Sequence, residues 1–201
     1  MPLPQPTVCL RPTQLGDLPW MARTAADPVA AGEHNWGGEP RIAVEIERDL
    51  RADFERDGLL RADDGSLVVA LADGTRIGTV SWRTERWGPS AGSRCLAFGI
   101  ALMPEFRGRG YGTEAQRQLV DYLFESTDTH RVQSDTALDN PAEQRVLRKI
   151  GMVEEGVVRG AELRDGTYHD HLLFSVLRPE WENQRGTRGP GSEDGANRRP
   201  T

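Results

Sequence analysis

Glycines are concentrated at residues 107–112 (Arg-Gly-Arg-Gly-Tyr-Gly), between an apolar stretch and a segment with helical spacing. The apolar stretch, residues 95–103, predicts a strand, and residues 113–124 predict a helix. Glycine tolerates positive φ and lets a ligand approach the backbone closely. The first amides of a helix have no partners within the helix and carry the positive end of its dipole. The run therefore predicts a strand, a turn and a helix N-terminus that binds phosphate.

Spacing excludes two common kinds of phosphate loop. A dinucleotide-binding fingerprint needs a third glycine three residues after the second, and that position holds Thr113. A Walker loop needs Gly-Lys-Ser or Gly-Lys-Thr, whereas the only lysine of the chain is Lys149. The phosphate must therefore belong to another class of ligand.

Length and composition limit the function further. At 201 residues the chain can form one well-buried domain and a tail. Its net charge of −6 argues against non-specific nucleic-acid binding. Cys9 and Cys95 show neither metal-ligand spacing nor a disulfide framework, so we expect no metal. The N-terminus lacks the pattern of a signal peptide and no stretch has membrane-spanning length, so we expect a cytoplasmic protein that does not contact membranes.

Periodicity and turn residues predict a mixed α+β domain around one central sheet. Thr13 is the expected cap of the first helix, which we predict to run to about Ala26. The predicted segments are strands at 7–12, 67–71, 76–82, 96–103, 131–136, 152–158 and 168–177, and helices at 13–26, 41–58, 113–124 and 141–150. We expect a flexible N-terminus (residues 1–6), a domain at 7–182 and a disordered tail at 183–201, where apolar residues almost vanish.

The pattern Arg107-x-x-Gly110-x-Gly112 is similar to the pyrophosphate loop of the GCN5-related N-acetyltransferase (GNAT) superfamily, which binds acetyl-coenzyme A. The resemblance covers about residues 8–181 and is densest from Phe98 onward. Within the superfamily the chain resembles the branch that includes the ribosomal-protein alanine N-acetyltransferases. The segments that carry this resemblance are 102–115, His130-Arg131-Val132, Asp139-Asn140, 145–152, 154–160 and 165–170.

The resemblance implies a GNAT-like single domain, with a central, mostly antiparallel, splayed sheet flanked by about four helices. It places the pantetheine arm of acetyl-CoA in the gap of the sheet, beside the backbone of residues 100–102. The implied cofactor-binding residues are Leu102, Arg107, Gly108, Arg109, Gly110, Tyr111, Gly112, Thr113 and Asn140. Asn140 is equally well explained as a helix cap.

Two departures from the family pattern leave the proton donor to the departing thiolate unassigned. Leu147 stands where the family often has a tyrosine. Glu143 stands where the alanine N-acetyltransferase branch often has a serine. Solvent is one alternative donor.

Direct attack by an amine on a thioester needs a general base, a carboxylate or histidine whose pKa lies near the operating pH. The candidate catalytic residues are Glu33, His34 and His169. His169 and His171 alternate with Asp170 on a predicted strand, so both should lie on one face. Trp36, Trp82 and His171 are the candidates for the acceptor pocket, with the core as the alternative place for Trp82. The loop at 87–92 is a further candidate wall.

We therefore expect an acetyl-CoA-dependent N-acetyltransferase that acts by direct transfer in a ternary complex. The acceptor is a primary amine, on a small molecule or a protein N-terminus. The alternative is a non-catalytic acyl-CoA-binding or regulatory module on the same fold, which the two departures favour. The oligomeric state stays open, with a homodimer as one option.

Overall fold

A seven-stranded sheet organises the protein, which a computed structural model describes over residues 7–32, 34 and 41–188. The strand order is β1-β2-β3-β4-β5-β7-β6. Every neighbouring pair is antiparallel except β4 and β5, which run parallel. The mostly antiparallel sheet is thus confirmed. The strands are β1 (Val8–Pro12), β2 (Asp64–Leu71), β3 (Arg76–Arg86), β4 (Arg94–Leu102), β5 (Arg131–Ala137), β6 (Val153–Arg164) and β7 (Thr167–Leu177).

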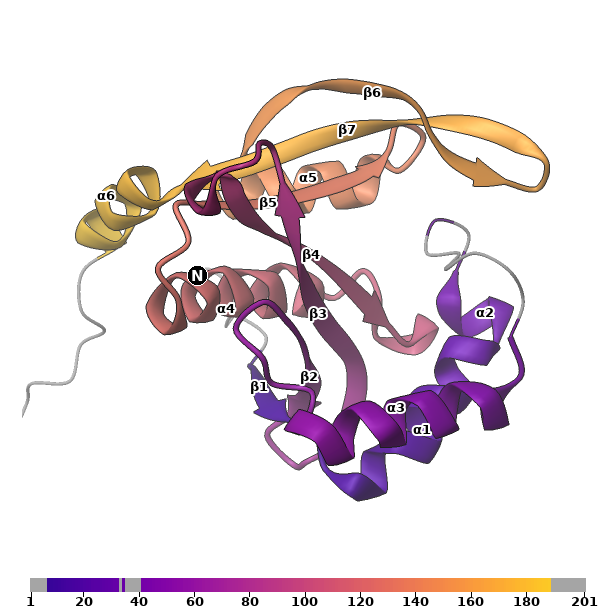
Figure 1. Cartoon of the computed structure of the whole chain (residues 1–201). Coiled ribbons are helices and arrows are strands. Elements are labelled where there is room, and N and C mark those ends of the chain that lie inside the picture. Colours follow the sequence, from indigo (N-terminus) through magenta and orange to yellow (C-terminus); the bar gives the residue numbers. More distant parts are fainter. Residues whose placement is uncertain (1–6, 33, 35–40, 189–201) are drawn as a thin grey trace, which may run out of the picture.

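Helices surround the sheet in two groups (Figure 1). One group, α1, α2 and α3, gathers beside the β1–β3 part of the sheet, whereas α4 and α5 lie together behind its central strands. The helices are α1 (Leu18–Ala26), α2 (Pro28–Ala31), α3 (Ala43–Asp57), α4 (Tyr111–Ser126), α5 (Pro141–Lys149) and α6 (Arg178–Arg188), with short 3-10 turns η1 (Leu15–Asp17), η2 (Ala91–Ser93) and η3 (Pro104–Phe106).

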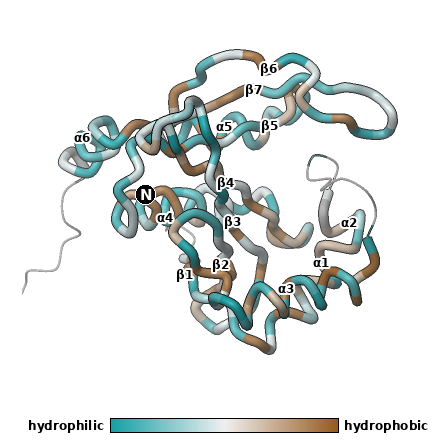
Figure 2. The backbone as a smooth tube through the Cα atoms, viewed as in Figure 1, coloured by the Kyte–Doolittle hydropathy of each residue, from teal (hydrophilic) through white to brown (hydrophobic). Residues whose placement is uncertain are grey.

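The core lies between the sheet and α4. Leu119, Leu123 and Phe124 of α4 are at most 1% exposed and belong to one cluster with Val80 and Phe174 of the strands. Burial of such side chains contributes about 1.5–3 kcal/mol each. By contrast, α3 has no buried residue, and hydrophilic and hydrophobic stretches alternate along it (Figure 2). It packs mainly on α1 and closes the domain at its edge.

Several boundaries differ from those predicted: β2 begins earlier, β3 and β6 extend further, and two differences near the ends of the domain have a visible cause. Thr13 does not cap a helix: it is buried, its Oγ1 donates to the carbonyl of Ser66, and α1 begins only at Leu18, after the turn η1. Residues 183–188, predicted as the start of a disordered tail, belong instead to α6, which continues to Arg188. Gln184 fastens it by donating to the carbonyl of Gly151 over 3.0 Å. Residues 189–201, and the N-terminal residues 1–6, lie outside the described part.

None of the helices in the described residues combines the length and the apolar character needed to cross a membrane.

Candidate functional site

The sheet opens between its two parallel strands. β4 and β5 pair only at Leu96–Val132 and Ala97–Gln133, after which β4 follows β3 and β5 follows β7. At the start of the opening, Ser134 Oγ on β5 donates a hydrogen bond to the carbonyl of Phe98 on β4, at 3.0 Å. The splayed sheet expected from the resemblance is therefore present.

Backbone groups of β4 face this opening. The amide of Met103 donates to the carbonyl of Ile77 on β3, so alternation along the strand turns the even-numbered residues toward β5. The carbonyls of Phe98 and Leu102 agree with this, because both accept side-chain donors from that side. Leu102, the last residue of β4, thus lies at the lip of the opening.

The glycine loop lies at the end of β4 and leads directly into α4. Gly110 caps α4 with φ 86°, and Gly108 has φ 71°, a region that L side chains rarely adopt. The first intrahelical bond runs from the amide of Glu114 to the carbonyl of Gly110. The preceding amides of the α4 N-terminus therefore have no acceptor within the helix, the geometry that binds anions. Tyr111 is half-buried against Phe106.

The two arginines of the loop differ. Arg107 Nε donates to the carbonyl of Leu102 at 2.8 Å, and its Nη2 donates to the carbonyl of Ala30. Its guanidinium thereby fastens the loop to β4 and α2. Arg109 is exposed. Of the two, Arg109 is therefore better placed to meet a phosphate in solvent.

Two polar side chains face each other behind the opening. Gln116 of α4 is fully buried, and Glu143 in the first turn of α5 is half-buried. Loss of hydration raises the pKa of the Glu143 carboxyl above its ordinary value, and the nearby Gln116 amide opposes this in part. Asn140 caps α5: its Oδ1 accepts from the amide of Glu143 at 3.2 Å and its Nδ2 donates to Thr136. The helix-cap interpretation of Asn140 is thus observed.

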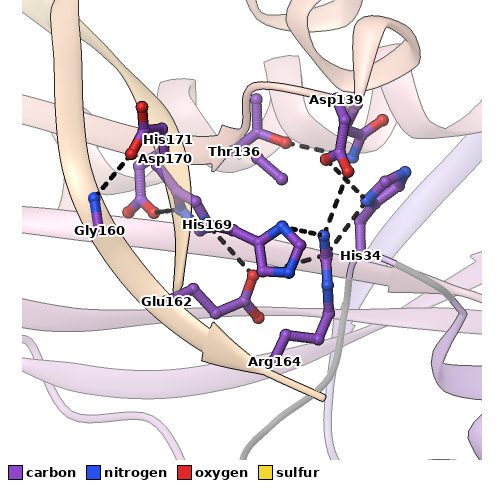
Figure 3. A network of polar contacts seen from close by, with 12 residues as sticks. His34, Thr136, Asp139, Gly160, Glu162, Arg164, His169, Asp170 and His171 are labelled. Atoms are coloured by element: carbon purple, nitrogen blue, oxygen red, sulfur yellow. Dashed lines mark hydrogen bonds and ion pairs between the residues drawn. The ribbon is translucent and has the colours of Figure 1, made fainter. Parts of the chain in front are cut away.

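A second polar group, centred on Arg164, joins the end of β6 to β7 and to the start of α5 (Figure 3). The Arg164 side chain is only 7% exposed. Its Nη2 lies 3.3 Å from Asp139 Oδ2 and 3.1 Å from His169 Nδ1. Its Nη1 lies 3.3 Å from His34 Nδ1 and 3.5 Å from Glu162 Oε2. The structure thus brings the predicted residues His34 and His169 together.

Arg164 sets the tautomer of His169. A guanidinium donates hydrogen bonds but cannot accept them, so the Nδ1 of His169 accepts from Arg164 and the ring proton lies on Nε2. The Nδ1 of His34 lies 3.3 Å from Arg164 Nη1 and also 3.4 Å from Asp139 Oδ1, so it can accept from the arginine or, when it carries the proton, donate to the carboxylate.

His171 is in the opposite state. Its Nδ1 lies 2.6 Å from Asp135 Oδ2 and its Nε2 3.2 Å from Glu162 Oε2, so both nitrogens face carboxylates. Burial lowers the pKa of this ring, but the hydrogen bonds to Asp135 and Glu162 outweigh burial and raise it above 6.5. Both ring nitrogens can donate to these carboxylates at once only when the ring is protonated, so the contacts of His171 favour the cation. Asp170 stays outside this group and accepts from the amide of Gly160.

Other predicted residues lie elsewhere. Trp82 is a core residue, 3% exposed, with its Nε1 donating to the carbonyl of Arg61, so the core alternative holds and its assignment to a pocket wall is wrong. The segment at 87–92 precedes β4, at the opposite end of that strand from the glycine loop, so it cannot wall a site at the opening. Trp87 instead lines a separate pocket with Cys95 and Arg131. Glu33 and Trp36 fall outside the described residues.

No local sequence pattern assigns a role to Arg164, the residue at the centre of the group. Only the hairpin register could have been found in advance, because Asp165-Gly166 is a two-residue turn of positive φ, which fixes it. That register places Glu162 opposite His169.

The sheet opening with a glycine loop at its lip defines a class of protein that binds a phosphate-bearing ligand beside a parallel strand pair. Comparison with known proteins identifies the family: residues 7–153 match the family model described as "Acetyltransferase (GNAT) domain". The chain therefore belongs to the GNAT acetyltransferase family.

Among curated relatives, YdaF of Bacillus subtilis, an N-acetyltransferase by name, is 34% identical over 93 residues, 46% of this chain and 51% of YdaF. YjcK of the same organism, also an N-acetyltransferase by name, is 33% identical over 117 residues, 57% of this chain and 62% of YjcK. The [Ribosomal protein uS5]-alanine N-acetyltransferase of Escherichia coli is 25% identical and covers 41% of this chain and 43% of its own length. The chain thus aligns with about half the length of these relatives.

Solved structures agree on the fold. The spermidine N-acetyltransferase of Vibrio cholerae, in complex with CoA and spermine, has a TM-score of 0.73 at 23% identity, covering 88% of this chain and 98% of that one. The same protein is known as a dodecamer. At this identity the likeness concerns the fold alone.

Proposed function

We propose that the protein is an acetyl-CoA-dependent N-acetyltransferase that moves an acetyl group directly to a primary amine in a ternary complex. The observation that carries this proposal is the opening between β4 and β5, with the glycine loop at its lip and the Arg164 group beyond it. Family membership supports it. Bound acetyl-CoA supplies an activated acyl group, and the chain itself supplies binding, charge and proton transfer.

The loop suits the pyrophosphate of acetyl-CoA. The amides of residues 108–113 would hold it, with Arg109 adding positive charge and Arg107 keeping the loop on β4. The backbone of Leu102 would face the pantetheine arm or the thioester oxygen. The unpartnered amide of Gln116 behind the opening also fits a polar ligand at this place.

Charge favours an amine as acceptor. Asp135, Asp139 and Glu162 bring three carboxylates to the Arg164 group, against the charges of Arg164 and His171. A cationic amine is attracted to such a site. The Asp139 side chain is the most exposed of the three, 56%, and is our candidate to receive the amine's proton, directly or through water.

His34 and His169 take a different role in this proposal. Both rings position the guanidinium, and through it His34 is joined to the β6–β7 hairpin. The Nε2–H of His169 is left to donate to an acceptor. In this proposal Asp139 takes the general-base role that the sequence suggested for the two histidines.

The first experiment is titration of the purified protein with acetyl-CoA, followed by release of free thiol with a panel of amines. We expect micromolar binding and thiol release with at least one polyamine or peptide N-terminus. Binding without thiol release from any amine would favour the acyl-CoA-binding module. No binding at millimolar acetyl-CoA would contradict both.

The setting we propose is the bacterial cytoplasm, where acetyl-CoA is made, because the relatives above are bacterial. Assembly into a homodimer or a larger oligomer is part of the proposal, since the Vibrio cholerae structure is a dodecamer.

A further inference from the structure

Gln116 is buried without the partners that such a group needs. It lies on α4, is 0% exposed, and neither Oε1 nor Nε2 makes a hydrogen bond within the described part of the chain. Buried side-chain amides are nearly always hydrogen-bonded, and an exception needs an explanation such as a ligand. The amide therefore indicates that something polar belongs beside it.

Glu143 is the side chain that Gln116 faces. Most glutamates near the sheet are paired with arginine, such as Glu155 with Arg131 and Glu154 with Arg148. Glu143 has no ion pair among the described residues; burial raises the pKa of its carboxyl, and Gln116 opposes this rise in part. A carboxylate in the first turn of a helix is usually stabilised as an anion. Here loss of hydration outweighs that stabilisation, and the pKa of the Glu143 carboxyl lies above its ordinary value.

Gln116 and Glu143 lie on the two helices that follow the splayed strands β4 and β5. α4 follows β4 and α5 follows β5, so the first turns of both helices lie at the C-terminal ends of the parallel strands. Ligands of sheets with parallel strands bind at this end. An acid without a cation partner thus stands behind the opening in which the thioester is proposed to lie.

We propose that Glu143 is the catalytic acid of the acetyl transfer, giving its carboxyl proton to the sulfur that leaves, with Gln116 steadying the carboxylate that forms. The inference rests on the proposed function. In this step the amine nitrogen bonds to the thioester carbon, the carbon–sulfur bond breaks, and its electron pair stays on sulfur. The sulfur takes the proton of Glu143. The amine's own proton leaves toward Asp139 or solvent, and solvent returns a proton to Glu143.

The chemistry suits a carboxylic acid of raised pKa. A thiol has a pKa of about 8.5, so the leaving sulfur needs only a moderate acid. A group whose pKa is brought toward the operating pH serves best as a general acid. Leu147, fully buried in the core, cannot take this role.

The first test needs no turnover. Acetyl-CoA is titrated into the protein near pH 7 in buffers of different ionisation enthalpy, which gives the number of protons taken up on binding. We expect uptake by the wild type, because the bound thioester further favours neutral Glu143, and none by Glu143→Gln. Glu45→Gln, an exposed first-turn glutamate of α3, is the matched control and should keep the uptake. Equal uptake by Glu143→Gln and the wild type would overturn the inference.

The second test uses an acceptor found by thiol release. Glu143→Gln should lower kcat about 100-fold, with KM for acetyl-CoA changed less than about threefold, and should lose the fall in activity at high pH. Glu143→Asp should recover part of the rate. Unchanged kcat in Glu143→Gln would overturn the inference. If the wild type acetylates no amine while proton uptake still disappears in Glu143→Gln, the proposed function fails but the contact of Glu143 with the coenzyme stands.

Discussion

At the scale of single residues, His171 shows how carboxylates can hold a histidine as a cation. Its folded-state pKa lies above 6.5, so its stabilising contribution is fully present below about pH 6.5 and is lost as pH rises through the folded value. His171→Gln should lower the free energy of unfolding by about 1–3 kcal/mol at pH 6, because two charge-assisted hydrogen bonds are lost, and by less at pH 9. Urea denaturation at both values measures this, with exposed His130→Gln as control. An equal loss at pH 6 and pH 9 would show that His171 is held as a neutral ring.

Predictions for single residues succeeded where the geometry of one strand alone determines which face a side chain occupies. The two-residue period of a strand is enough to place His169 and His171 on one face. The side chains that meet them come from β5 and β6, and His34, after α2, joins the group only through Arg164 and Asp139. Arg164 and His34 are far apart along the chain, and no local pattern joins them. Only the hairpin register was available in advance, from the Asp165-Gly166 turn.

At the scale of elements, a matched pair of glycine substitutions distinguishes loss of the ligand-binding loop from a general effect of backbone strain. Gly110 and Gly74 both have φ 86°, but Gly110 caps α4 while Gly74 lies in the turn between β2 and β3. A β-branched residue at either place imposes strain of about 1–3 kcal/mol. Gly110→Val should therefore weaken acetyl-CoA binding at least tenfold by calorimetry, and Gly74→Val should not. Loss of affinity in both variants, or in neither, would contradict the assignment of the loop.

Elements were predicted well where period and turn residues agree. The hairpin of β2 and β3, the run from β4 through the glycine loop to α4, and the Asn140-Pro141 start of α5 were all found from sequence. The miss at Thr13 has a tertiary cause, because its hydroxyl bonds to β2 instead of to a helix. Trp82 shows the same limit: an aromatic residue on a strand suits a pocket or a core, and only packing decides.

At the scale of the whole molecule, α6 supports the helix that carries the loop. Trp181 stacks on Phe124 of α4 with ring centroids 5.0 Å apart, and its Nε1 donates to Asp121 at 2.7 Å. Arg178 donates to the carbonyls of Phe124 and Thr127 at the C-terminal end of α4. The start of α6 is thus part of the domain, although the sequence that follows Trp181 is strongly polar.

Because Trp181 is 7% exposed and fills the end of the core, Trp181→Ala should lower the free energy of unfolding by about 3–5 kcal/mol. Glu182→Ala, at an exposed position of the same helix, is the matched control and should change it by less than about 0.5 kcal/mol. Urea denaturation measures both. The glycine loop lies at the opposite end of α4, so Trp181→Ala should keep its acetyl-CoA affinity at temperatures where it stays folded. If instead stability hardly changes, α6 is not part of the folded unit, and the domain ends before Trp181, earlier than residue 182 where the change in composition predicts its end.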